Sequence, residues 1–246
     1  MLLASHTHPA SHGVVEAPEP DLELELLTAT ILKPRTEASD RMQMLDVAYE
    51  LWSSVWKETF QELENRRALP SDDFTRQDEL LTLWYAGQCI ALTAIRWVNF
   101  EQRCFHDDSY FAAWPRSALH AICSAGTKVC IPSYATVAKP WRHVAGGLLK
   151  DVLFAIATER CLASGADVIV GTTRNDRGIN EVCARNGYRP VAKDLTFHNV
   201  SVDLVAFWPK SCNRPPMDAT EEAVVQKLLS QLHLGGTRED APARAR

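Results

Sequence analysis

The second half of the chain alternates between strand-like and helix-like patterns, and this order constrains the fold more than any other feature. The stretch "KVCIPSYATVA" (128–138) has the composition of a strand, and "ADVIVGTTR" (166–174) is typical of a buried strand. Between them, "HVAGGLLKDVLFAIATERCLASG" (143–165) has the apolar spacing of a helix. A short helix over 175–187 and two strands within 188–208 follow. This order predicts an α/β fold with a mixed sheet flanked by helices.

The first half adds a strand, a long helix and a hairpin. Residues 22–32 first alternate between apolar and polar residues and then include β-branched ones, which indicates a strand. Residues 38–67 form the strongest helical pattern of the chain. Residues 79–98 are interpreted as two strands joined by a tight turn around the letters "AGQ". A last amphipathic helix is predicted near the C-terminus, where Asp218 and Glu221 resemble a capping box.

These patterns divide the chain into four segments. Residues 1–21 are rich in Pro, Ala, Ser and His and are predicted to be a disordered tail. Residues 22–210 form the expected α/β domain, 211–235 carry the C-terminal helix, and 236–246 form a second disordered tail. We find no internal repeat.

Charge and cysteine content exclude several classes of function. The net charge is −5 and the pI about 5.9, so a broad nucleic-acid-binding face is not expected. The seven cysteines are odd in number and form no C-x-x-C pair, which favours buried thiols in a reducing compartment over disulfides or a metal site. No stretch is long and apolar enough to span a bilayer. A cytoplasmic protein with neither nucleic acid nor membrane as partner is expected.

The pair Gly146-Gly147 stands between a predicted strand and a predicted helix. Backbone N–H groups at a helix start are unpaired and carry the positive end of the helix dipole, and glycines let a phosphate approach them. The sequence has no G-x-x-x-x-G-K-[ST], which excludes a P-loop, and "AGG" lacks the spacing of a dinucleotide fingerprint. Two interpretations stay open: a phosphate cradle, and a tight turn into the helix with no ligand.

The residues around this pair resemble the cofactor loop of the GNAT superfamily of acyl-CoA-dependent acyltransferases, which reads R/Q-x-x-G-x-G/A after a strand. Arg142, Ala145 and Gly147 lie in that register, with Ala145 where the first glycine is usual. Downstream, "NGYRPV" resembles the family's "lGFr.v" ending, and upstream 79–98 resembles its second and third strands. The resemblance covers roughly residues 45–208.

The resemblance implies a mostly antiparallel twisted sheet, and an acyl group transferred from acetyl-CoA or another acyl-CoA to an amine of a small molecule. No metal is implied. It also implies that the backbone around Val137 and Ala138 polarises the thioester carbonyl. The cofactor-binding residues that it implies are Val137, Arg142, His143, Val144, Ala145, Gly146, Gly147 and Asn175.

The residues that would carry the chemistry are less clear from the sequence. In the family, a tyrosine that serves as the general acid lies four residues before the "G-Y/F" pair. Cys183 occupies that position here, either as a weak donor or as a packing residue. The family's frequent glutamate on the fourth strand is also missing, and Tyr134 is the titratable side chain there, pointing into the site or into the core. His106, beside two aspartates, is a third candidate; its alternative is a solvated loop.

A long aromatic segment over 100–114 and the tryptophan-rich first helix are similar to the acyl-homoserine-lactone and long-chain N-acyl amino acid synthases. Those enzymes take fatty acyl groups from an acyl carrier protein, so this carrier is the alternative donor and partner. The segment either lines a chain-binding cleft or covers the core. A CoA-binding module without turnover is the alternative of another class, and a homodimer stays open.

Overall fold

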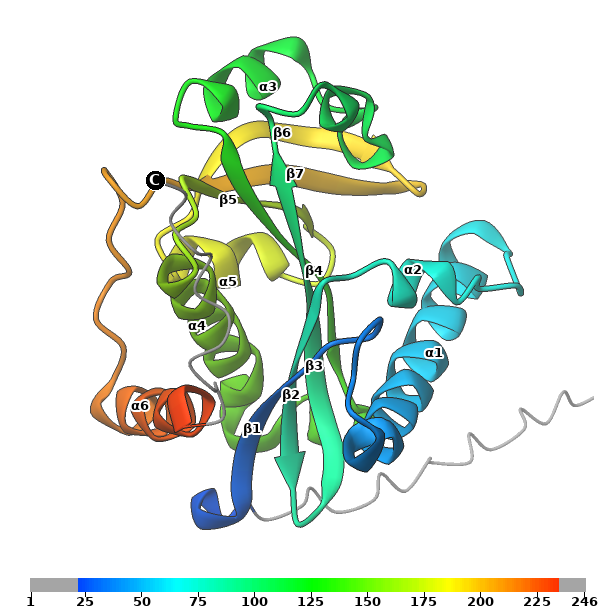
Figure 1. Cartoon of the computed structure of the whole chain (residues 1–246), viewed down its shortest axis with the longest axis vertical. Coiled ribbons are helices and arrows are strands. Elements are labelled where there is room, and N and C mark those ends of the chain that lie inside the picture. Colours follow the sequence, from blue (N-terminus) through cyan, green and yellow to red (C-terminus); the bar gives the residue numbers. More distant parts are fainter. Residues whose placement is uncertain (1–21, 235–246) are drawn as a thin grey trace, which may run out of the picture.

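The computed structural model describes residues 22–234, whose seven strands form one sheet in the order β1-β2-β3-β4-β5-β7-β6 (Figure 1). Neighbouring strands are antiparallel except β4 and β5, which are parallel. The prediction of a mixed, mostly antiparallel sheet flanked by helices is confirmed. The strands are β1 (Leu27–Leu32), β2 (Glu79–Tyr85), β3 (Gln88–Asn99), β4 (Lys128–Val137), β5 (Val168–Arg174), β6 (Arg189–Phe197) and β7 (Val200–Phe207).

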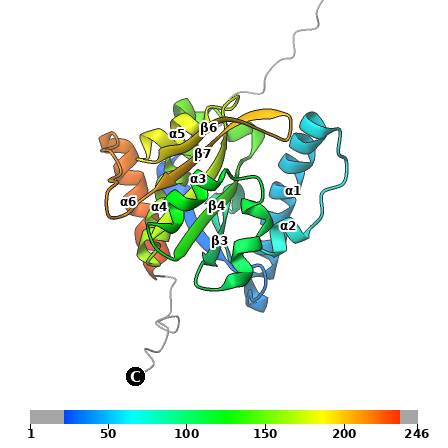
Figure 2. The ribbon, with the colours of Figure 1, turned by 90° about the horizontal axis from the view of Figure 1, so that it is seen from above.

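Helices cover both faces of this sheet (Figures 1 and 2). Residues of β3 show which helices cover which face. Leu92 and Val98 point to one face, where Leu92 packs with α1 and α2 and Val98 packs with the segment that contains α3. Ile95 points to the other face, where α4 and α6 lie. The helices are α1 (Met42–Glu64), α2 (Asp72–Thr75), α3 (Arg116–Cys123), α4 (Leu148–Ala163), α5 (Ile179–Arg185) and α6 (Ala219–Leu234).

Two local signals of the sequence are confirmed. The β2–β3 connection is the two-residue turn Ala86-Gly87, with φ values of 46° and 82°, as a hairpin turn that matches strand twist requires. At the start of α6, Asp218 Oδ1 accepts from the amide of Glu221 at 2.9 Å while Glu221 Oε2 accepts from the amide of Asp218 at 3.4 Å. This reciprocal pair is a capping box.

The C-terminal helix packs into the same core as the sheet. Val225 and Leu228 of α6 are fully buried beside β1, and the amide of Ala29 donates to Gln231 Oε1 at 2.8 Å. Both predicted disordered tails, 1–21 and 236–246, lie outside the described residues. Within 22–234, no helix is long and apolar enough to cross a membrane.

Candidate functional site

The sheet opens between its two parallel strands. β4 and β5 pair only at Val129 with Val168 and at Cys130 with Ile169, although both strands continue for several residues. Beyond those pairs, Ser133 on β4 is only half-buried and Thr172 on β5 is exposed, which is unusual for interior strands of a seven-stranded sheet. The two strands therefore separate, and their facing backbone edges are left without a partner strand.

A β-bulge shapes the β4 side of this opening. Tyr134 and Ala135 together stand opposite Thr93 on β3, and Tyr134 has a φ of 55°. A neighbouring hydroxyl holds each of the two nearest carbonyls: Thr93 Oγ1 donates to Ser133 O at 2.9 Å, and Thr136 Oγ1 donates to Tyr134 O at 2.7 Å. A bulge re-aims backbone groups, and these bonds fix it despite the strain of a left-handed tyrosine.

The side chain of Tyr134 points to the face covered by α1. Its ring lies edge-on to the rings of Trp52 and Trp56, with centroids 5.7 and 5.0 Å away. Burial raises the pKa of the Tyr134 phenol, the charge of Asp73 raises it further, and Arg76 partly opposes both. Tyr134 is therefore a neutral phenol at physiological pH. It lies in the aromatic cluster between α1 and the opening.

The loop before α4 has the backbone of an anion cradle. Ala145, Gly146 and Gly147 have φ values of 48°, 69° and 91°, and α4 then begins at Leu148 without any side-chain cap. Within the loop, the Gly146 amide donates to His143 O at 3.1 Å and the Leu148 amide donates to Ala145 O. The groups that remain for an anion are the later amides of the first turn of α4, at the positive end of the helix dipole. The helix predicted from residue 143 thus starts five residues later. The three left-handed residues cannot continue a right-handed helix.

The charges around this loop suit an anion. Residues 139–150 contain Lys139, Arg142 and Lys150 and no carboxylate, in a chain whose net charge is −5. Of the predicted loop residues, His143, Ala145 and Gly146 are exposed, whereas Val144 and Gly147 are buried and anchor the loop.

Val137 and Ala138, the backbone that the resemblance implied as the carbonyl-polarising group, are both hydrogen-bonded within the protein. The Val137 carbonyl accepts from Arg142 Nε at 3.2 Å, which fixes the arginine beside the end of β4. The Ala138 amide donates to Ile90 O at 2.8 Å, so it is already bonded to β3.

Asn175, at the end of β5, belongs to a network that ties β5 to β7. Its Nδ2 donates to Ser201 Oγ at 3.0 Å and to Asp203 Oδ1 at 3.1 Å. Burial would raise the pKa of Asp203, but hydrogen bonds from the Asp194 amide and from the Asn175 and Asn180 side chains lower it overall. Asn175 Oδ1 is buried without a hydrogen-bond partner.

Cys183 and His106 do not meet at the opening. Cys183 on α5 is 2% exposed within the core beside Tyr188, and burial raises the pKa of its thiol far above the usual range. A thiol in this state is a packing group and a weak donor. His106 is exposed, with Nε2 2.8 Å from Phe100 O. Asp108, which was expected beside the histidine, accepts instead from Arg96 at 2.7 Å.

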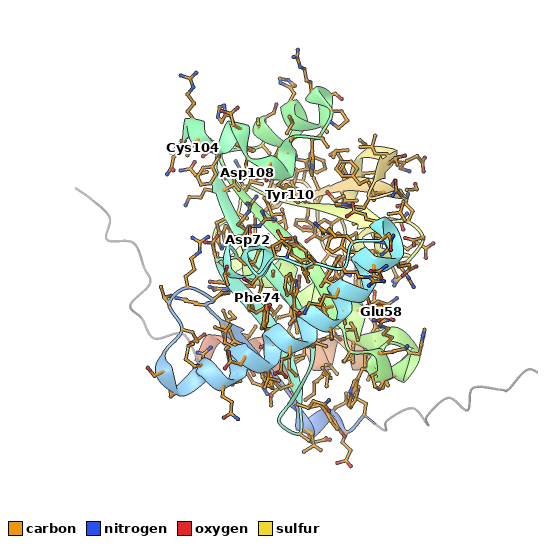
Figure 3. All side chains as sticks on the ribbon, turned by 90° about the vertical axis from the view of Figure 1, so that its right-hand side faces the viewer. Glu58, Asp72, Phe74, Cys104, Asp108 and Tyr110 are labelled. Atoms are coloured by element: carbon orange, nitrogen blue, oxygen red, sulfur yellow. The ribbon has the colours of Figure 1, made fainter. Side chains whose placement is uncertain are left out.

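Tyr110, from the aromatic segment that the sequence pointed to, meets two residues that the sequence did not single out, Arg96 and Thr172. Arg96 lies on β3 and Thr172 on β5. Tyr110 lies in the aromatic segment (Figure 3). The Tyr110 hydroxyl is 3.5 Å from Thr172 Oγ1, and its ring lies 6.0 Å from the Arg96 guanidinium carbon. An arginine inside the apolar run "ALTAIRWV" was the one available signal.

The rest of the aromatic segment covers the core. Phe111 and Trp114 are each 4% exposed, pack on one another and on the sheet, and belong to the same cluster as Val98 and Ile131. Tyr110 differs from these two because it remains partly exposed beside β5. Within residues 22–234, no three His, Cys, Asp or Glu side chains gather closely enough to hold a metal ion.

The C-terminal end of α1 contacts segments from the other side of the opening. The turn between β6 and β7 brings His198 against Glu64, and Asn199 Nδ2 donates to Leu63 O at 3.0 Å. From the β5–α5 loop, Arg177 pairs with Glu62 at 2.9 Å. The two halves of the sheet are thus joined on the face where Tyr134 lies.

No family model and no curated protein matches the sequence. Among solved structures, the AHL synthase LasI is similar over 73% of this chain and 88% of its own, with 13% identity and a TM-score of 0.53. The CoA-dependent acyl-homoserine lactone synthase BjaI, solved with SAM and isopentyl-CoA, is similar over 82% of this chain and 89% of its own, with 13% identity and a TM-score of 0.52. FeeM, an N-acyl amino acid synthase from uncultured soil microbes, is similar over 75% of this chain and 92% of its own, with 12% identity and a TM-score of 0.51. The resemblance seen in residues 45–208 is therefore confirmed at the level of fold, and the chain has an acyl-CoA N-acyltransferase-like fold.

Proposed function

We propose that the protein is an N-acyltransferase that moves an acyl group from acyl-CoA to the amine of a small molecule. One observation carries the proposal: the opening between β4 and β5 leads directly to a left-handed anion cradle at the start of α4. A pantetheine thioester and its pyrophosphate need these two features side by side, one to admit a narrow chain and the other to hold its charge.

The donor would be held by backbone and cations. Backbone amides at the start of α4 would bind the pyrophosphate, with Lys139, Arg142 and Lys150 adding charge. The bulge at Tyr134 and Ala135 would face the thioester carbonyl, where a fixed backbone donor stabilises developing negative charge. The thioester supplies an activated acyl group, and the protein supplies position and a dry environment.

The acceptor would enter from the face of α1. Tyr134 stands there as a neutral phenol beside Trp52 and Trp56, next to the bulge. A flat aromatic surface with one hydroxyl suits a small molecule that carries apolar groups and an amine. In this proposal Tyr134 contacts the acceptor and Cys183 packs behind the site.

A long-chain synthase supplied by an acyl carrier protein is the second candidate. It is supported by the structural likeness to FeeM and LasI and by an aromatic segment that reaches the opening through Tyr110. BjaI, which has the same fold, is described as CoA-dependent and was solved with isopentyl-CoA, and this supports a CoA donor. The acyl-length profile measured with acyl-CoA and with acyl carrier protein separates the two candidates.

Turnover tests the proposal. We expect the purified protein to release free thiol from a panel of acyl-CoA thioesters faster in the presence of an amine panel than without it, and mass spectrometry should find the matching amides. Heat-inactivated protein is the control. CoA binding without amide formation would contradict the acyltransferase proposal and favour a binding module.

A further inference from the structure

Tyr110 carries a hydroxyl from the aromatic segment to the edge of β5. Its oxygen lies 3.5 Å from Oγ1 of Thr172, which is three residues beyond Ile169, the last β5 residue paired with β4. On β4, Ser133 stands three residues beyond Cys130 and directly before the bulge. Parallel strands advance by the same rise per residue, so Tyr110 and the bulge lie at the same level on opposite sides of the opening.

The phenol of Tyr110 keeps its proton at neutral pH. Burial raises the pKa of Tyr110 to about 12, against hydrogen bonds from Thr172 and the charge of Arg96, which lower it. The group is therefore protonated throughout the neutral pH range. Tyr110 is partly exposed as a residue, while its hydroxyl lies in a desolvated position beside Thr172.

Two charged residues hold Tyr110 in place. Asp108 Oδ1 accepts the backbone N–H of Tyr110 at 2.9 Å and also accepts Arg96 Nη2 at 2.7 Å. Both side chains are largely buried, with 14% and 17% of their surface exposed. Asp108 and Arg96 thus connect the turn that carries Tyr110 to β3, and they act as positioning residues.

The thiol of Cys183 and the phenols of Tyr188 and Tyr134 have different surroundings. Cys183 is enclosed in the core, the Tyr188 hydroxyl is bonded to Thr158 Oγ1 at 2.9 Å, and Tyr134 points toward α1. Tyr110 is thus the phenol that meets β5 within the opening.

We infer that Tyr110 is the catalytic residue that protonates the departing sulfur, an assignment that rests on the proposed acyltransferase function. The amine nitrogen forms a bond to the thioester carbonyl carbon, and the carbon–sulfur bond then breaks. The sulfur takes its proton from the Tyr110 hydroxyl, and the phenolate recovers a proton from the nitrogen. The products are an amide and a free thiol, and Tyr110 returns to its starting state.

Binding of the thiol product tests this assignment without turnover. If Tyr110 donates to the sulfur, wild-type protein should bind CoA about tenfold more tightly than desulfo-CoA, which lacks the sulfur, at a pH where the bound thiol ionises. In Tyr110→Phe this preference should disappear while the affinity for desulfo-CoA stays unchanged. Calorimetric titration measures both affinities. Tyr49→Phe on α1 makes the same chemical change away from the opening and should keep the preference.

The turnover number gives the second readout. With saturating acyl-CoA and amine, kcat should fall on the order of 100-fold in Tyr110→Phe and stay near wild type in Tyr49→Phe. A Tyr110→Phe protein that keeps either its preference for CoA or its kcat would overturn the assignment and leave the acyltransferase proposal intact. Wild-type protein that binds neither CoA nor desulfo-CoA and consumes no thioester would remove the proposed function itself.

Discussion

Replacing Gly146 by glutamate is expected to weaken CoA binding by about 30-fold, because it places a carboxylate in the anion cradle. Gly146 is exposed, and a Cβ built there meets no atom within 4 Å, so the side chain fits without displacing the loop. Two unit charges about 5 Å apart repel by roughly 3 kcal/mol at an effective dielectric constant of about 20, and salt reduces this at an exposed site. Each 1.4 kcal/mol changes affinity about tenfold.

The matched control is Gly165→Glu at the other end of the same helix. Gly165 has a φ of 78°, close to the 69° of Gly146, and its Cβ position is equally open. Both variants therefore carry the same backbone strain and the same added charge, and they differ only in their distance from the cradle. Calorimetric titration with CoA compares them. Equal affinities for the two variants would show that CoA does not bind at the start of α4.

Replacing Gly187 by alanine is expected to lower the free energy of unfolding by about 3 kcal/mol. Gly187 has a φ of 85°, which costs an L-residue about 1–2 kcal/mol. A Cβ at this position would also lie 2.5 Å from the carbonyl oxygen of Asn213 and 3.2 Å from the Phe207 ring. Overpacking of this kind typically costs about 1–3 kcal/mol more.

Gly165→Ala separates the two contributions. Its backbone is equally left-handed, but its Cβ meets nothing within 4 Å, so we expect a loss of about 1 kcal/mol from conformation alone. Urea denaturation gives both values. If the two alanine variants were destabilised equally, the close approach of the 213 backbone to Gly187 would not explain the glycine in "NGYR".

The order and type of elements could be predicted from the sequence because they depend on short-range patterns. The hairpin turn Ala86-Gly87 and the capping pair of Asp218 and Glu221 are local devices, and both are confirmed. The Gly146-Gly147 pair also pointed to the correct junction of strand and helix. The start of α4 was placed five residues early, because Ala145 adopts a left-handed conformation that its residue type does not announce.

The site itself depends on contacts between distant segments, and the sequence could not place it. The opening exists because β4 and β5 pair at only two positions, which no local pattern encodes. Tyr110 reaches Thr172, 62 positions along the chain, through a turn that Arg96 fixes from a third segment. Closeness in sequence did not predict the contacts of the site. Asp108 was expected beside His106 but accepts a hydrogen bond from Arg96.

We propose that an acyl-CoA lies with its pyrophosphate at the start of α4 and its pantetheine between β4 and β5. A crystal structure of the protein with a non-hydrolysable acyl-CoA analogue tests it most directly. We predict pyrophosphate oxygens within hydrogen-bonding distance of backbone amides at the start of α4, and the acyl carbonyl beside the bulge at Tyr134 and Ala135. An analogue bound on another surface, or phosphates away from this loop, would contradict the account.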